Sequence, residues 1–194
     1  MKKCPYDSVR PNPVGDLPRI DPTAYIDPTA QVIGHVRIGP GVFIGPNAVL
    51  REDELTEPGT EASIVIGPEC NVQDGVIIHS LAGEMVNVGP RVSLAHGCVI
   101  HGPCDIGDES FIGFRAIIFK AALGSGSFVG HGAVVQGVEL PSGTLVPPGA
   151  VVASPEAVSQ LSKTGSAERE FNKEVVATNI RLAKGYLALK YKAE

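Results

Sequence analysis

Three histidines of the chain have a spacing that suits a metal site. His79 and His101 each end a short aliphatic run, and His96 precedes His101 by five positions. Neutral imidazole is a common metal ligand, and three imidazoles leave a tetrahedral Zn²⁺ one open position, which is typical of catalytic zinc. Such an ion lowers the pKa of bound water to about 7, so that a hydroxide can attack a small electrophile near neutral pH.

Turnover at such a site also requires a group that moves protons between the site and bulk solvent. Two acidic residues are candidates, Glu54 and Glu84, and Glu84 lies shortly after His79 in the sequence. For Glu84 an ordinary solvated loop carboxylate is the simpler interpretation. Glu54 is therefore the preferred candidate for the proton relay.

The elements that must position these side chains follow from a repeat of six residues. Aliphatic residues recur at this period, with two interruptions and two slips of one residue: Ile26, Val32, Ile38, Ile44, Leu50, Ile66, Val72, Ile78, Val88, Leu94, Ile100, Ile106, Ile112, Ile118, Leu123, Val129, Val135, Leu140, Val146 and Val152. A period of six fits a short strand followed by a turn, and three such units close one triangular coil. The pattern predicts an all-β solenoid, a parallel β-helix of hexapeptide repeats whose coils stack about 4.8 Å apart.

The register of the repeat converts residue numbers into positions. When the two interruptions are treated as loops, Leu50, Ile78, Ile100 and Ile118 fall in one inward column. The residues that follow them form a second column, which faces outward because side chains alternate along a strand. This column contains Arg51, His79, His101 and Phe119. We therefore expect the α-carbons of His79 and His101 to lie about 5 Å apart on adjacent coils.

His96 falls in a different column, near another corner of the prism. On the preceding coil, Asp74 occupies the equivalent position and is expected to stack on His96. His96 is badly placed to reach the other two histidines of its own chain. A three-fold arrangement of chains solves this, because His96 can complete the histidine pair of a neighbour. The register thus predicts a homotrimer with one metal site at each interface.

The remaining histidines and the cysteines have simpler interpretations. His35 and His131 have no stacked partner of the right kind for a metal site and are expected to be solvated or hydrogen bonded. Cys70, Cys98 and Cys104 occupy the small-residue position of the repeat and are expected to be buried small hydrophobic residues.

The repeat ends near residue 153, and helical signals follow. Ser154 and Pro155 suggest an N-cap and first position of a short helix, and Ser166 is expected to cap a longer one. The expected apolar face of the longer helix consists of Phe171, Val175, Val176, Ile180, Leu182, Ala183, Tyr186 and Leu187. We divide the chain into a β-helix with an N-terminal extension, 1–153, and a helical segment packed on it, 154–194.

Composition excludes several classes of function. The chain has 194 residues, a formal charge of −5 and no Trp, so it lacks the basic surface and the stacking aromatics of a nucleic-acid-binding protein. No apolar run approaches the roughly 20 residues of a membrane span. No apolar stretch follows the N-terminal lysines, so we expect a cytoplasmic protein.

Several stretches together resemble the gamma-class carbonic anhydrases of the archaeal type. They are residues 50–54, 71–79, 92–102, 107–113 and 179–186, and the likeness covers nearly the whole chain. The resemblance implies a left-handed β-helix, a homotrimer and the reversible hydration of carbon dioxide to bicarbonate by a metal-bound hydroxide. The implied metal is zinc, or iron(II) or cobalt(II) as in related enzymes.

The resemblance also implies roles for individual residues. His79, His96 and His101 correspond to the metal ligands, and Glu54 to the acid that relays protons. Three amides fit the site as well: Asn71 and Gln73 correspond to residues that hold the hydroxide and the substrate, and Asn179 to a polar residue near the site. Arg51 and Asp74 correspond to an ion pair across the subunit interface.

One departure from the family pattern and two alternative functions are weighed with this prediction. The archaeal-type pattern includes a long acidic loop with a shuttle Glu after the first ligand, whereas only residues 80–87 link His79 to Val88. Proton transfer is then expected to depend on Glu54. The alternatives are an acyltransferase of the hexapeptide superfamily, which uses one His as a base, and a metal-stabilised trimeric scaffold without turnover.

Overall fold

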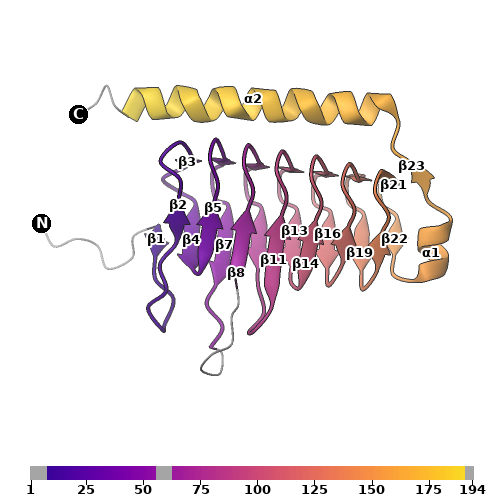
Figure 1. Cartoon of the computed structure of the whole chain (residues 1–194), viewed down its shortest axis with the longest axis horizontal. Coiled ribbons are helices and arrows are strands. Elements are labelled where there is room, and N and C mark those ends of the chain that lie inside the picture. Colours follow the sequence, from indigo (N-terminus) through magenta and orange to yellow (C-terminus); the bar gives the residue numbers. More distant parts are fainter. Residues whose placement is uncertain (1–7, 56–62, 191–194) are drawn as a thin grey trace, which may run out of the picture.

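The fold is a β-helix with one long helix lying along it (Figure 1). The computed structural model describes residues 8–55 and 63–190. The start of the predicted segment 1–153, part of the first interruption of the repeat and the end of the predicted segment 154–194 lie outside the described residues. The predicted solenoid is confirmed, because the strands are short and pair in parallel with the equivalent strand one coil away.

Three sheets form the faces of the prism, and we name them A, B and C. Sheet A contains β1 (Val9–Arg10), β4 (Gln31–Gly34), β7 (Val49–Glu52), β10 (Ile77–His79), β13 (Val99–His101), β16 (Ile117–Phe119), β19 (Val134–Gln136) and β22 (Val151–Val152). Sheet B contains β2 (Arg19–Ile20), β5 (Val36–Ile38), β8 (Ser63–Ile66), β11 (Met85–Val88), β14 (Cys104–Ile106), β17 (Ala122–Leu123) and β20 (Glu139–Leu140). Sheet C contains β3 (Tyr25–Ile26), β6 (Phe43–Ile44), β9 (Asn71–Val72), β12 (Ser93–Leu94), β15 (Phe111–Ile112), β18 (Phe128–Val129), β21 (Thr144–Val146) and the antiparallel β23 (Ser162–Lys163).

The core fills the inside of the prism with the residues of the six-residue repeat. Every aliphatic residue of that repeat except the half-buried Ile26 is buried. In sheet A, Ile78 pairs with Leu50 on one side and with Ile100 on the other, and Ile100 pairs with Ile118. The predicted column is confirmed, so the outward residues next to it are also in register.

The corners of the prism are tight turns that leave little room for side chains. At Gly113, a β-carbon would lie 2.7 Å from the backbone nitrogen of His131 and from the carbonyl oxygen of Val129 in the next coil. Glycine at such positions lets successive coils stack at strand spacing.

The helical segment begins where the β-helix ends. The Ser154 hydroxyl accepts a hydrogen bond from the Ala157 amide at 3.2 Å and caps α1 (Pro155–Ser159), as predicted. The longer helix α2 (Ser166–Lys190) begins at Ser166 itself, so the prediction that Ser166 is its cap was wrong. Instead the carboxylate of Glu168 accepts a hydrogen bond from the Gly165 amide and satisfies a free donor at this end.

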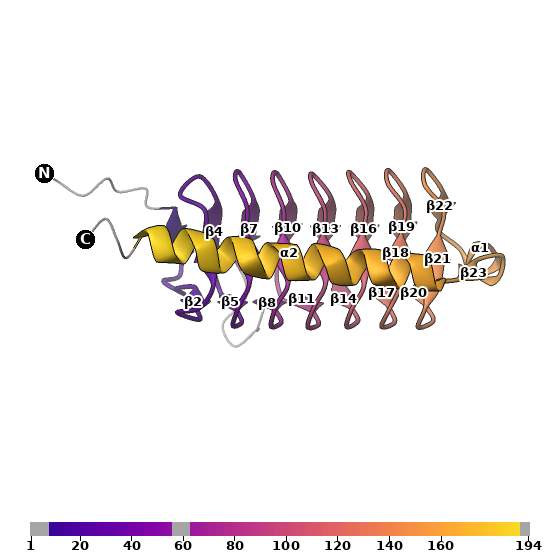
Figure 2. The ribbon, with the colours of Figure 1, turned by 90° about the horizontal axis from the view of Figure 1, so that it is seen from above.

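Helix α2 runs along the β-helix over sheet C, and the two perpendicular views agree on this (Figures 1 and 2). The predicted contact face packs on sheet C: Tyr186 stacks on Tyr25, Phe171 meets Phe111 edge to face, and Val176 and Ala183 are buried. Phe171, Leu182 and Tyr186 are each more than two fifths exposed, whereas Asn172 and Asn179 are buried. The prediction omitted Asn172, whose amide donates to the Glu109 carbonyl at the corner between sheets B and C, because a buried amide needs such a partner. Among the described residues, no helix is both long and apolar enough to cross a membrane.

Candidate metal centre

The outward column of sheet A brings two histidines together. His79 and His101 are paired across β10 and β13, with Arg51 next to His79 and Phe119 next to His101. The Nδ1 atom of His79 lies 3.2 Å from Nε2 of His101. The rings meet edge to face, with centroids 4.9 Å apart, and Phe119 packs edge-on against His101. The predicted stacking of the two histidines is confirmed.

The other nitrogens of these two rings are available for a ligand. Nε2 of His79 and Nδ1 of His101 are buried and have no hydrogen-bond partner among the described residues. Burial, reinforced by the charge of Arg51 and by His101, holds the pKa of His79 below its ordinary value. His79 is therefore neutral at neutral pH, which is the form of histidine that binds a metal.

Glu54 is fixed beside the histidine pair. Its Oε2 atom accepts a hydrogen bond of 2.9 Å from the backbone amide of Ala82. Its Oε1 atom then lies 3.6 Å from Nε2 of His79, which is a contact rather than an ion pair because His79 is neutral. The short segment between β10 and β11 thus anchors Glu54, whereas the Glu84 side chain in the same segment is exposed.

His96 lies at the corner between sheets C and A, as the register predicts. Its Nδ1 atom lies 2.6 Å from a carboxylate oxygen of Asp74, which occupies the same corner one coil earlier. A histidine that donates one ring N–H to a carboxylate presents its other nitrogen as a lone pair. Asp74 therefore orients the ring so that Nε2 of His96 is the nitrogen that could bind a metal.

A buried line of polar side chains runs beside His96 in sheet C. The Gln73 amide donates to Oδ1 of Asn71, and the Asn71 amide donates to the hydroxyl of Ser93, both at 2.8 Å. Asn71 and Ser93 are fully buried, and Gln73 is 8% exposed. Because Asn71 is held on both sides, the orientation of the Gln73 amide is fixed.

Asn179 of α2 lies beside Gln73 and His96, on the helix that covers sheet C. It lines a cavity of about 340 Å³ together with Gln73, His96 and Phe114. Its amide nitrogen donates to the Val175 carbonyl of its own helix at 2.9 Å, so the side chain is held in place. The structure therefore groups Asn71, Gln73, Asp74, His96 and Asn179 on the sheet C side.

The predicted site is thus divided into two halves within one chain. The sheet A half contains His79, His101, Glu54 and Arg51, and the sheet C half contains His96 with the amides. In the described part of a single chain, no three His, Cys, Asp or Glu side chains are grouped closely enough to hold a metal ion. Arg51 pairs with Asp53 at 3.0 Å in this chain, while Asp74 pairs with His96.

Sequence reasoning missed two parts of this arrangement. The Ala82 amide that anchors Glu54 carries no signal in the sequence, because any residue except proline supplies it. The second part is an aromatic stack at the corner that holds His96. The ring centroid of Phe114 lies 5.4 Å from that of His96 and 4.3 Å from that of His131, on which Phe114 stacks. The register could have revealed this stack, because these residues share one corner column. His131 is hydrogen bonded, as predicted, and accepts from the Phe114 amide.

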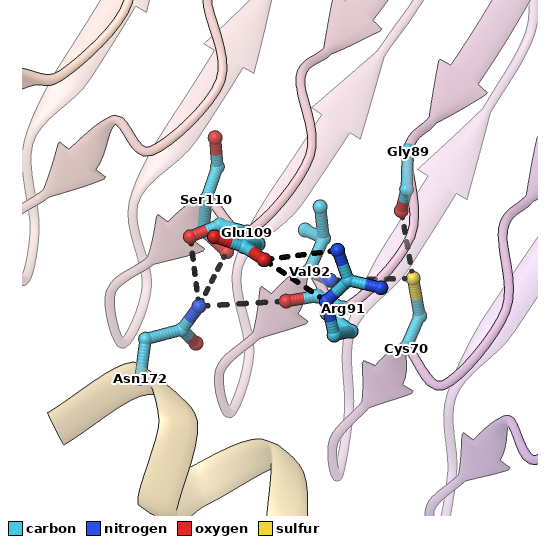
Figure 3. Close-up of polar contacts among 7 residues, drawn as sticks. All are labelled: Cys70, Gly89, Arg91, Val92, Glu109, Ser110 and Asn172. Atoms are coloured by element: carbon cyan, nitrogen blue, oxygen red, sulfur yellow. Dashed lines mark hydrogen bonds and ion pairs between the residues drawn. The ribbon is translucent and has the colours of Figure 1, made fainter. Parts of the chain in front are cut away.

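The cysteines stand apart from this chemistry. Cys70, Cys98 and Cys104 are buried, as predicted. Burial raises the pKa of the Cys70 and Cys98 thiols to about 12. Cys70 donates to the Gly89 carbonyl and accepts from the Val92 amide (Figure 3). These thiols stay protonated at neutral pH and are not poised to bind a metal.

Comparison with known proteins identifies the family. Residues 18–52 match the family model of the bacterial transferase hexapeptide (six repeats). The chain is 36% identical to the carbonic anhydrase of Methanosarcina thermophila, over 93% of this chain and 82% of that protein. The chain belongs to the gamma-class carbonic anhydrase family.

Other proteins that are similar to this chain carry different names. The carboxysome assembly protein CcmM of Nostoc is 37% identical over 87% of the chain, which spans 31% of the length of CcmM. A hexapeptide transferase family protein from Anaplasma phagocytophilum has a similar structure, with a TM-score of 0.76, 26% identity and coverage of 92% of this chain and 97% of that one. Chains that share this fold therefore include proteins with more than one named function.

The residues of this gamma-class family member fit the metal that the family implies. Nε2 of His79 and Nδ1 of His101 are buried without partners, and His96 has Nε2 left by Asp74. Three imidazoles suit zinc, and equally iron(II) or cobalt(II). The donor set is therefore chemically complete, although it is distributed over two faces of the prism.

Proposed function

We propose that the protein catalyses the reversible hydration of carbon dioxide to bicarbonate at metal sites shared between the chains of a homotrimer. The observation that carries the proposal is the stacked pair of His79 and His101, each with a buried ring nitrogen that has no partner. His96 of a neighbouring chain would supply the third imidazole. The proposed ion is zinc, or iron(II) or cobalt(II).

The bound ion would supply a Lewis acid that lowers the pKa of water to near neutrality. The chain's own residues then have to hold that ion and the substrate. Asp74 fixes the orientation of His96, and a carboxylate in this position typically raises metal affinity 10- to 100-fold. Burial keeps His79 neutral, so no proton competes for its lone pair at neutral pH.

The amides of the sheet C half would orient the reactants. The oxygen of Gln73 is directed by the chain of hydrogen bonds from Gln73 to Asn71 to Ser93. Such preorganised dipoles stabilise developing charge without having to rotate during the reaction. Asn179 would add a further polar group above the same cavity.

Glu54 would move protons between the site and the solvent. Its carboxylate is only partly buried, so Oε1 can receive a proton near His79 and release it to buffer. The hydrogen bond from the Ala82 amide holds the carboxylate at this position. With only residues 80–84 between β10 and β11, Glu54 takes the place of a longer acidic loop.

A trimer is supported by a ladder of outward aliphatic residues in sheet A. Their register is continuous over six strands: Val49, Ile77, Val99, Ile117, Val134 and Val151. Ile77 is 44% exposed, Ile117 40% and Val151 68% in the single chain. A continuous apolar stripe of this kind is typical of a surface covered by another chain. It lies directly beside the column of His79 and His101, where the neighbour's His96 is needed.

The test compares two histidine variants of the purified chain. His101→Ala is expected to abolish metal binding and carbon dioxide hydration in an anaerobic stopped-flow assay, because it removes one of three ligands. His35→Ala is the matched control, since it also removes a half-buried histidine but leaves all three ligands. Full metal content in His101→Ala would refute the site. Metal with no hydration would favour a scaffold, and acyl-CoA binding without metal would favour a hexapeptide acyltransferase.

A further inference from the structure

A second cavity lies between α2 and the corner that joins sheets B and C, away from the histidines. Its volume is about 230 Å³. Ten residues line it: Glu69, Arg91, Glu109, Gly126, Arg169, Asn172, Lys173, Val176, Ala177 and Ile180. Small-molecule sites usually span about 300–1,000 Å³, so this cavity suits a ligand smaller than a typical drug.

Asn172 lines the cavity and carries a buried acceptor that no group of the described residues satisfies. The residue is 4% exposed, and its amide nitrogen donates to the Glu109 carbonyl at 2.8 Å, with longer contacts to the carbonyls of Arg91 and Ser110. Its Oδ1 atom is buried without a partner among the described residues. Figure 3 shows this oxygen on the side of the amide turned away from the three carbonyls. Leaving a buried acceptor unpaired is costly, so a ligand with an N–H or O–H donor is favoured here.

The rim of the cavity carries both signs of charge. Glu69, Arg91 and Glu109 stack at successive turns of one corner, where each backbone amide donates to the Pro carbonyl of the coil before it. Arg91 is bound by Glu109 at 2.9–3.0 Å. On the helix, Arg169 uses one N–H to bond the Thr164 carbonyl, which holds the guanidinium near the cavity while its other donors remain.

The floor of the cavity is apolar. Val176 is buried, Ala177 is a small exposed residue of the helix wall, and Ile180 is half-buried. The site thus combines an uncompensated acceptor, acidic and basic groups, and an aliphatic surface. A molecule that satisfies all three must carry a donor, a negative group and a short hydrocarbon chain.

We propose that this cavity binds a small α-amino acid with an aliphatic side chain. The ammonium group donates to Oδ1 of Asn172 near the corner carboxylates, the carboxylate meets Arg169, and the side chain packs on Val176 and Ile180. This site is independent of the metal chemistry proposed above. It would make the protein a sensor or carrier of an amino acid as well.

Isothermal titration calorimetry of the full-length protein tests the proposal with three probes that differ by one group. L-leucine carries all three features, 4-methylpentanoate lacks the ammonium group, and 3-methylbutylamine lacks the carboxylate. Saturable binding is expected for L-leucine. Each analogue should bind about tenfold more weakly or worse, because losing one charged partner costs on the order of 1.4 kcal/mol or more.

Variants of the helix localise the binding. Ala177→Phe fills the cavity and should weaken L-leucine binding at least tenfold, whereas Ala167→Phe places the same ring on an exposed part of α2 outside the cavity. Arg169→Gln, which removes the charge but keeps a donor, is the second variant and should weaken the binding of L-leucine more than that of the amine. The proposal is overturned if L-leucine shows no saturable binding, if both Phe variants bind it like the unmodified protein, or if 4-methylpentanoate binds equally well.

Discussion

Complementation between two inactive variants tests the shared metal site quantitatively. His79 and His101 lie on β10 and β13 of sheet A, and His96 lies at the corner after β12. A His79→Ala chain therefore keeps its His96, and a His96→Ala chain keeps its histidine pair. Neither variant alone can form a complete site, but a mixed interface can contain all three ligands.

The expected yield follows from counting interfaces. An interface is complete only when the pair comes from a His96→Ala chain and the third ligand from a His79→Ala chain. For equal amounts and random assembly in a cyclic trimer, this occurs in about one quarter of interfaces. At a ratio of three to one the fraction falls to about three sixteenths, so metal content passes through a maximum at equal mixing.

The assay measures tightly bound metal after the two variants are unfolded together and refolded anaerobically with metal. Native mass spectrometry confirms that mixed trimers have formed. A mixture of His79→Ala with His101→Ala is the matched control, because both variants damage the same half and no interface can be repaired. The reasoning is refuted if proven mixed trimers bind no metal, or if the control mixture binds as much as the complementing one.

Three further predictions concern proton transfer, assembly and backbone fit. Glu54→Gln should lower the maximal hydration rate in weak buffer and be partly rescued by imidazole; an unchanged rate would remove Glu54 from the relay. Ile117→Glu should leave the chain folded but monomeric by analytical ultracentrifugation. Covering the exposed 40% of Ile117 contributes roughly 1 kcal/mol of association free energy per interface, whereas burying a charged Glu at this position opposes association. Gly185→Ala should raise the free energy of unfolding by roughly 0.5–1 kcal/mol, since its β-carbon meets open space, whereas Gly113→Ala should lower it; equal denaturation midpoints for the two variants would contradict this.

The period of the sequence predicted the fold well because one physical rule is repeated at every coil. Each six-residue unit must bury one aliphatic residue, so the positions of Ile78, Ile100 and Ile118 determine the register of the outward residues beside them. The same counting placed His79 over His101 and His96 over Asp74. Long-range contacts in a solenoid are set by local counting, which is rarely so for a globular fold.

The features that escaped prediction depend on non-repetitive contacts. The predicted apolar face of α2 does contact sheet C, through Phe171 and Tyr186 among others, but the prediction omitted Asn172, which is buried and donates to the Glu109 carbonyl. The six-residue pattern does not indicate which backbone carbonyls the corners of the β-helix expose to a helix. The anchoring of Glu54 by a backbone amide is invisible for the same reason.

The division of the site into two halves has a consequence for stability under the proposed function. The corner with His96 and the face with His79 belong to different sides of a rigid prism, so a single chain cannot close the site by a small movement. In the proposed trimer, burial of the aliphatic ladder beside the histidine pair would drive the association of a second chain. Metal binding and trimer formation are then thermodynamically linked: the ion stabilises the trimer by binding only to the assembled form, and dilution that separates the chains releases the ion.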